Sequence, residues 1–369
     1  MKERDRSVDV LRGIGIIAVV AGHASSGMGL APFSPYSFHM PLFFFLSGMF
    51  FREGEIEGAR SLAAHIKTFL LPTTACIVFY AFLCKLLAAF GFAALDRPIT
   101  LTNLFLTQFS TSGAYPFTSP YWFIPSLFLV RVYFGGVHTR LIRLTGGGTG
   151  RSLAIVEGLF LLAYLSMSVG SIVLSRELYA VKSMSLIKIG ILHITFASFF
   201  YYFGFVCAKY RLQRYMAGVF VLFALYVIQQ HLWATGTVLD FWMQIMKFES
   251  PILPIVTSLT GVAFFFGISQ LIAAHRGASP LAYIGGKGLP IVLHQLFGFF
   301  VLNLILCGLG FIRPGDITGQ YFQWHTEKTW PLYVIFGVVV PLLIDRYVVG
   351  RSKRALSNVV ERWRLRITG

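Results

Sequence analysis

Four ionisable side chains near the N-terminus have the types and spacing that proton-transfer chemistry needs. Asp9, Arg12 and His23 share the segment DVLRGIGIIAVVAGH, and His39 begins the apolar run HMPLFFFLSG. An imidazole titrates near neutral pH, so it can act as a general base towards a hydroxyl group. An arginine can orient an anionic group, and a carboxylate can hold the arginine in place. We therefore treat these four residues as candidate catalytic residues.

The spacing of the first three residues places them on one face of a helix. At 3.6 residues per turn, Arg12 and His23 differ in direction by only about 20° and lie about 16 Å apart along the axis. A polar stripe would then lead from one boundary of the segment into its apolar part. Two alternatives stay open: Asp9 and Arg12 form an interfacial ion pair while His23 anchors to headgroups, and His39 is a buried ring bonded to a carbonyl.

The composition indicates the kind of scaffold that must position these residues. The chain has 369 residues, of which 56% are hydrophobic and 12% are charged, and its mean hydropathy is +0.71. Such values exclude an ordinary water-soluble domain and predict an all-α polytopic membrane protein. We expect about ten membrane-spanning helices, near residues 8–27, 38–52, 68–91, 120–137, 152–174, 190–208, 213–231, 252–274, 281–309 and 330–349.

The positions of the basic residues along the chain explain the net charge of +16 without a nucleic-acid partner. If both termini are cytoplasmic, most of the 31 Lys and Arg residues fall in cytoplasmic segments, as the positive-inside rule requires. We expect one integral domain over residues 1–350, with N-in and C-in orientation, in the inner (cytoplasmic) membrane. Residues 351–369 are expected to form a basic amphipathic tail on the anionic lipid surface.

Metal chemistry is not expected from the sequence. The four cysteines, Cys76, Cys84, Cys207 and Cys307, lie in apolar segments without a CxxC pair, so neither disulfides nor a metal site is predicted. We expect no metal and no permanently bound cofactor.

Several sequence segments resemble one family of membrane enzymes. In chain order they are RSVDVLRGIGIIAVVAGH, FHMPLFFFLSGMFF, LLP, YWFIPSLFLV and LAYIGGKGLPIVLHQ. They are similar to the acyltransferase-3 family of bacterial membrane O-acyltransferases, from Arg6 to about Asp345. The resemblance implies transfer of an acyl group, commonly acetyl from acetyl-coenzyme A, to a hydroxyl of a surface carbohydrate or similar acceptor. It also implies that His23 is the catalytic centre and that Arg12 is its functional partner.

The donor of such a reaction would be a cytoplasmic acyl-coenzyme A, whose phosphates require basic groups on the inner side. Arg12, His65, Lys67 and Arg131 are the residues that we expect to bind it. The family often has two arginines one residue apart before the third span, where this chain has His65 and Lys67. A lysine lacks the bidentate geometry of arginine, so donor binding through this segment departs from the family pattern.

The acceptor would be a carbohydrate or a lipid-linked glycan, on a membrane side that the sequence does not fix. Trp122, Tyr321, Trp324 and His294 are the candidates for binding it, because aromatic rings stack on sugars and the histidine can donate or accept a hydrogen bond. Aromatic residues also gather at membrane interfaces without any ligand, and His294 is equally consistent with helix packing.

Other interpretations remain open at this point. Glu157 and Arg131 are expected at similar depths and could form an ion pair. His23 could act as a base during direct transfer, or it could carry the acyl group transiently. A secondary transporter or an export protein for a small molecule or glycan is the alternative function, since it would also hold charged residues within a helical bundle. The oligomeric state is not indicated.

Overall fold

The computed structural model describes most of the chain, namely residues 5–24, 31–54, 56, 58–107, 113–145 and 151–350. The predicted tail at 351–369 lies outside these residues. In the described ranges the chain forms helices and connecting loops, without a β-strand. Seven of these helices are long and apolar enough to cross a membrane. The predicted all-α polytopic membrane fold is therefore confirmed.

The α-helices are, in chain order, α1 (Arg6–Ala24), α2 (Pro35–Met49), α3 (Ala59–His65), α4 (Leu71–Ala89), α6 (Phe123–Tyr133), α7 (Thr139–Leu144), α8 (Arg151–Ala180), α9 (Leu186–Lys209), α10 (Val219–Ala234), α11 (Leu253–Ala273), α12 (Ser279–Gly286), α13 (Gly288–Gly308) and α14 (Thr326–Ile344). Tighter or wider helical turns extend several of them, namely η1 (Ile66–Leu70), η4 (Pro116–Trp122), η5 (Phe134–His138) and η10 (Asp345–Val349).

Two predicted spans correspond to shorter helices, and a third is assembled from consecutive helical pieces. The span near 38–52 is α2, which begins at Pro35 and has 15 residues, a length of about 22 Å. Proline is well tolerated in the first turn, because the backbone N–H that it lacks would have no partner there. The span near 213–231 is α10, and the span near 120–137 is the continuous run η4, α6 and η5.

The span predicted at 281–309 is not one helix. It breaks at Lys287, which separates α12 from α13. Gly285, Gly286 and Gly288 flank the break, and glycine is a poor helix former because its backbone loses more entropy on ordering. Hydropathy alone could not reveal this break, because the residues on both sides of Lys287 are apolar.

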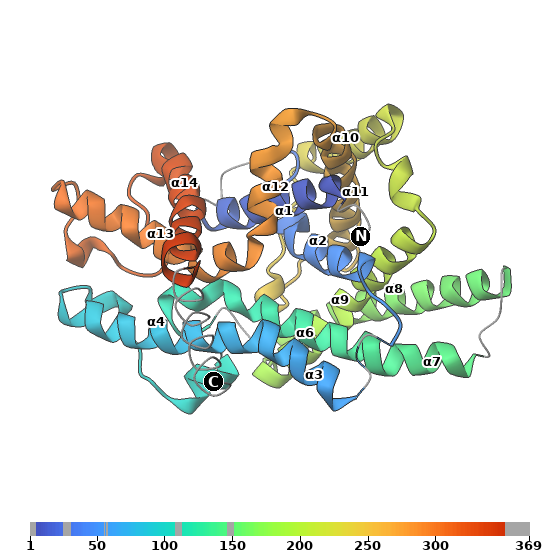
Figure 1. Cartoon of the computed structure of the whole chain (residues 1–369), viewed down its shortest axis with the longest axis horizontal. Helices are drawn as coiled ribbons and strands as arrows, with labels where there is room; N and C mark the ends of the chain where they lie inside the picture. Colours follow the sequence, from blue (N-terminus) through green and yellow to red (C-terminus); the bar gives the residue numbers. More distant parts are fainter. Residues whose placement is uncertain are drawn as a thin grey trace, which may run out of the picture.

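Helix α1 lies at the centre of the molecule, with α2, α11 and α12 around it (Figure 1). Its contact with α12 is close because two glycines face the partner backbone. A Cβ atom at Gly13 would lie 2.1 Å from the Leu281 carbonyl oxygen, and one at Gly285 would lie 1.9 Å from the Asp9 carbonyl oxygen. Small residues allow such approach between membrane helices. The approach brings the glycine-rich break beside Arg12.

Helix α2 is held in the same way by α9. A Cβ atom at Gly48 would lie 1.7 Å from the Tyr201 carbonyl oxygen, and one at Gly204 would lie 2.0 Å from the Phe45 carbonyl oxygen. This close contact fixes α2, which carries His39, against one of the long helices.

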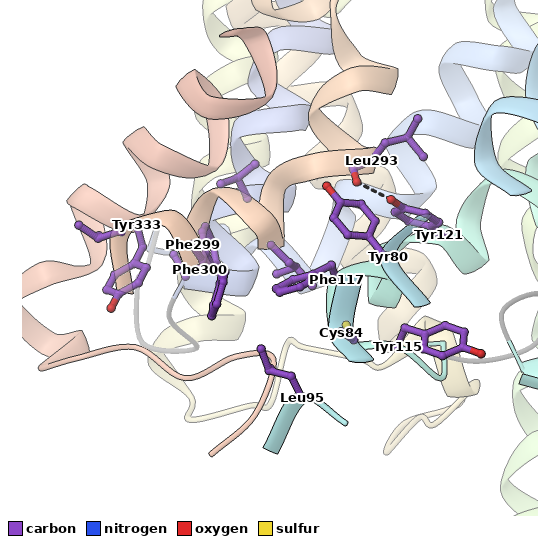
Figure 2. Close-up of a cluster of buried hydrophobic side chains, with 14 of the residues drawn as sticks. Tyr80, Cys84, Leu95, Tyr115, Phe117, Tyr121, Leu293, Phe299, Phe300 and Tyr333 are labelled. Atoms are coloured by element: carbon purple, nitrogen blue, oxygen red, sulfur yellow. Dashed lines mark hydrogen bonds between the residues drawn. The ribbon is translucent and has the colours of Figure 1, made fainter. Parts of the chain in front are cut away.

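An aromatic cluster joins α13 and α14 to α4 and η4 (Figure 2). Tyr80, Phe117, Phe299 and Phe300 are buried in it. Tyr121 of η4 donates a hydrogen bond to the Leu293 carbonyl oxygen of α13, drawn as the dashed line in Figure 2. Because Trp122 follows Tyr121, this bond also sets the position of Trp122 relative to α13.

Candidate active site

A cavity of about 290 Å³ lies beside α1. Its walls come from α1, α2, η1, η4, α6, the segment between α10 and α11, the α12–α13 break and the start of α13. The lining is mainly apolar and aromatic, consisting of Arg12, Ile16, Val19, His23, Tyr36, His39, Met40, Phe43, Phe69, Pro120, Trp122, Phe123, Ile124, Leu127, Phe241, Met243, Gln244, Gly285, Gly286, Gly288, Leu289 and Val292.

One stripe of α1 faces this cavity. Arg12, Ile16, Val19 and His23 line it, and their spacing of four, three and four residues is that of a single helix face. Arg12 and His23 therefore face one space, as their spacing predicted. Asp9 is buried one turn before Arg12, and its Oδ1 atom lies 3.5 Å from Arg12 Nη1. The Arg12 guanidinium also lies over the Phe50 ring, 5.0 Å from its centroid.

His23 contacts side chains from two other parts of the chain. The Tyr36 hydroxyl oxygen, from α2, lies 3.4 Å from His23 Nδ1. The Tyr321 ring, from the segment between α13 and α14, stacks on the imidazole with a centroid distance of 5.5 Å and an interplanar angle of 19°. From the same segment, Gln323 Nε2 donates a hydrogen bond of 2.7 Å to the His23 carbonyl oxygen.

The hydrogen bond made by the His39 ring determines which of its nitrogens carries the proton. Its Nδ1 atom bonds to the Pro35 carbonyl oxygen, and a carbonyl oxygen can only accept, so Nδ1 carries the proton. In the neutral ring the lone pair is then on Nε2, which is the nitrogen that can accept a proton. His39 is buried and lines the same cavity as His23. The two imidazoles therefore line one common cavity.

Tyr36 is a site residue that sequence reasoning missed. Its ring makes edge contacts with both imidazoles, at centroid distances of 6.3 Å to His23 and 5.3 Å to His39. Helical spacing was the available signal, because Tyr36 precedes His39 by three residues and so lies on the same face of α2.

The candidate acceptor residues fall into two groups. Trp122 lines the cavity, and Tyr321 stacks on His23. Trp324 and His294 are engaged in packing instead, Trp324 against α14 and His294 of α13 against α4. The backbone N–H of Trp324 donates to the Tyr333 hydroxyl (2.8 Å), and His294 Nδ1 lies 2.7 Å from the Tyr80 hydroxyl oxygen.

Two of the candidate donor residues, Arg131 and His65, lie against Phe69, a cavity-lining residue of η1. The Arg131 guanidinium lies over the Phe69 ring, 5.3 Å from its centroid. His65 stacks on the same ring at 6.4 Å, and its Nδ1 donates a hydrogen bond of 2.9 Å to the Ser61 carbonyl oxygen. Lys67 is exposed. Arg12 is thus the candidate donor residue that lines the cavity itself.

Glu157 does not pair with Arg131 as the sequence suggested. It is buried, and its carboxylate accepts hydrogen bonds from Lys209 Nζ and from the Tyr210 hydroxyl (2.6 Å). The hydrogen bond to Glu157, with help from burial, raises the pKa of Tyr210 to about 12. The difference arises because α8 packs against α9, which brings the end of α9 to Glu157.

In the described part of the chain, no group of three or more His, Cys, Asp or Glu side chains could hold a metal ion. The four cysteines are free thiols, and each is buried or partly buried.

The comparisons with known proteins give one match. A family model described as "Acyltransferase domain", that of the acyltransferase-3 family, matches residues 5–344. The searches of curated proteins and of solved structures find no match.

Proposed function

The chain belongs to the acyltransferase-3 family, and we propose that it transfers an acyl group from acyl-coenzyme A to a hydroxyl of a cell-surface carbohydrate or glycolipid. Acetyl is the acyl group that we favour. One observation carries this proposal: Arg12 and His23 of α1 face a single apolar cavity that His39 also lines. The family does not favour the alternative of a transporter or export protein.

In the proposed reaction, His23 removes the proton from the acceptor hydroxyl. The hydroxyl oxygen forms a bond to the thioester carbonyl carbon, the carbon–sulfur bond breaks, and the leaving sulfur takes up the proton. The aromatic lining supports this step, because Phe43, Trp122 and Phe123 would keep water away from the thioester. An acyl-histidine intermediate on His23 would need the same residues.

The proposed donor path starts at Arg12. The Asp9 carboxylate would hold its guanidinium in place, and Arg12 would orient the donor at the inner end of the α1 stripe. We propose that Arg131, His65 and Lys67 bind the coenzyme A phosphates, an arrangement favoured by the position of Arg131 and His65 against Phe69. The pantetheine arm would then pass along Ile16 and Val19 towards His23.

The proposed acceptor path reaches His23 from the opposite end of this stripe. Trp122 and Tyr321 would contact the acceptor beside His23. Trp324 and His294 would act at a greater distance, because Trp324 already bonds to Tyr333 of α14 and His294 to Tyr80 of α4. We further propose an inner-membrane location with both termini in the cytoplasm, which would expose the donor end to cytoplasmic coenzyme A.

The test of this function uses the purified full chain in nanodiscs with radiolabelled acetyl-coenzyme A and extracted envelope glycans. We expect label to reach the glycans with the wild type and not with His23→Ala. His231→Ala is the matched control, because His231 is an exposed histidine of α10 outside the cavity. Transfer at the wild-type rate by His23→Ala, with retained donor binding, would refute the proposed role of His23. No transfer from any of several acyl-coenzyme A donors would argue against the enzyme function.

A further inference from the structure

The segment between α13 and α14 contacts His23 at both its backbone and its ring. His23 lies in the last turn of α1, where carbonyl groups lack a donor within the helix. Gln323 supplies such a donor, because its Nε2 donates a hydrogen bond of 2.7 Å to the His23 carbonyl oxygen. Since this oxygen can only accept, the amide orientation of Gln323 is fixed.

Tyr321 fixes the ring of the same histidine. Its ring stacks on the imidazole at 5.5 Å, and its hydroxyl is hydrogen-bonded to Ser119 Oγ of η4. Ser119 is buried and precedes the cavity residues Pro120 and Trp122. The Tyr321 ring is thereby tied to the wall that faces His23.

Phe322 and Trp324, the neighbours of Gln323 in the chain, are also held by hydrogen bonds. Asn303 Nδ2 of α13 donates to the Phe322 carbonyl oxygen (3.1 Å), and the backbone N–H of Trp324 donates to the Tyr333 hydroxyl of α14 (2.8 Å). Tyr333 in turn donates to Asn303 Oδ1 (2.6 Å). Both Asn303 and Tyr333 are buried. Residues 321–324 therefore rest on a hydrogen-bonded frame formed by two helices.

We propose that Gln323 is a positioning residue for acyl transfer, which together with the Tyr321 ring holds His23 in its reactive orientation. This inference rests on the proposed function, because it assigns a task to Gln323 only if His23 reacts. A displacement of a reacting group by about 1 Å can lower a rate roughly 100-fold. Gln323 acts at the acceptor end of the stripe, about 16 Å along α1 from Arg12, so donor binding should not depend on it.

The test measures kcat, the KM for acetyl-coenzyme A and the unfolding temperature of four single variants, one double variant and one control variant of the full chain. Gln323→Leu and Gln323→Glu remove the donor to the His23 carbonyl. Tyr321→Leu removes the stacked ring, whereas Tyr321→Phe keeps it. Gln230→Leu, at an exposed site of α10, is the matched control.

We expect both Gln323 variants to lower kcat about tenfold or more while the KM for acetyl-coenzyme A stays within about twofold. Tyr321→Phe should lose less activity than Tyr321→Leu. In the double variant Gln323→Leu/Tyr321→Leu, kcat should fall by a smaller factor than the product of the factors for the two single variants, because both residues act through His23.

Two results would overturn the inference. One is an unchanged kcat in Gln323→Glu and Tyr321→Leu, both able to bind donor, while His23→Ala is inactive. The other is a fall in kcat that is matched by a rise in KM and a loss of unfolding temperature, as a merely structural role would give. Failure of the proposed function would differ from both, because the wild type would then transfer nothing.

Discussion

His23 is the residue on which the contacts of the site converge. The Tyr36 hydroxyl faces its Nδ1 atom, the Tyr321 ring stacks on it, and Gln323 binds its carbonyl oxygen. Arg12, at the other end of the cavity stripe, is held by Asp9. The two ends of the stripe therefore have separate tasks in the proposed reaction, and separate substitutions should affect them differently.

The first prediction concerns Arg12. Replacing Arg12 by Gln removes the charged guanidinium from the cavity. Hydrogen bonds that a charged group makes to a bound molecule contribute about 1.5–3 kcal/mol. We expect the KM for acetyl-coenzyme A to rise at least about tenfold, and Arg12→Lys to lie between Arg12→Gln and the wild type. Steady-state transfer kinetics would measure this, with Arg276→Gln as a control at an exposed site. An equal KM in Arg12→Gln and wild type would exclude donor binding by Arg12.

The second prediction concerns Tyr210 and alkaline pH. Its pKa is raised from its usual 10.0 to about 12 by the bond to Glu157, so the folded protein holds this proton more tightly than the unfolded chain. The resulting stabilisation is complete below pH 10 and disappears as the pH rises through about 12. We expect Tyr210→Phe to lack this part of the pH dependence. The unfolding temperatures of the wild type and of Tyr210→Phe, measured between about pH 10 and pH 12, test this. Parallel curves for the two proteins would contradict the prediction.

The relation between residues on one helix could be predicted from the sequence, whereas contacts between residues far apart in the chain could not. Arg12 and His23 belong to α1, where helical geometry alone sets their relation. Tyr321 and Gln323 follow His23 by about 300 positions, and their contacts depend on how α13 and α14 pack. Their sequence, QYFQW, gives no sign of which helix they approach.

At the scale of elements, glycines determine how closely helices approach α1 and α2. The pairs Gly13 with Gly285 and Gly48 with Gly204 allow backbones to touch. Composition and hydropathy could place most helices, because long apolar runs in a membrane must be helical. Hydropathy could not find the break at Lys287, because it averages over the apolar runs on both sides of the GGKG segment at 285–288.

The third prediction tests the α1–α12 contact. A Cβ at Gly285 would lie 1.9 Å from the Asp9 carbonyl oxygen and 3.0 Å from Arg12 Cβ, so Gly285→Ala must push the helices apart. Overpacking of this kind costs about 1–3 kcal/mol, and it would also displace Arg12. We expect a lower unfolding temperature and a higher KM for the donor. Gly190→Ala in α9 is the control, because no atom lies within 4 Å of its added Cβ; equal effects of both changes would contradict the prediction.

At the scale of the whole molecule, α1 packs among α2, α11, α12 and α14 (Figure 1), and its stripe from Arg12 to His23 lines the cavity. The charge distribution along the chain predicts that Arg12 is near the cytoplasm and His23 near the opposite side. This orientation would let a cytoplasmic donor and an acceptor from outside approach the two ends of one stripe.

The fourth prediction tests that orientation with single cysteines. Thr237→Cys, between α10 and α11, should react with a membrane-impermeant maleimide in intact cells. Arg60→Cys, at the start of α3, should react only after permeabilisation. The four native cysteines are buried or partly buried, and the unmutated chain provides the background. The reverse labelling pattern would mean that the donor and acceptor ends are exchanged.

The most direct test of the central claim asks where the acyl group binds. An acyl-coenzyme A analogue with a photoreactive acyl chain would be irradiated with the full chain in nanodiscs, and the labelled residues located by mass spectrometry. The account predicts labelling of cavity residues such as Val19, Phe43 and Val292, which excess acetyl-coenzyme A suppresses. Labelling confined to residues outside this cavity, equally suppressed by acetyl-coenzyme A, would contradict it.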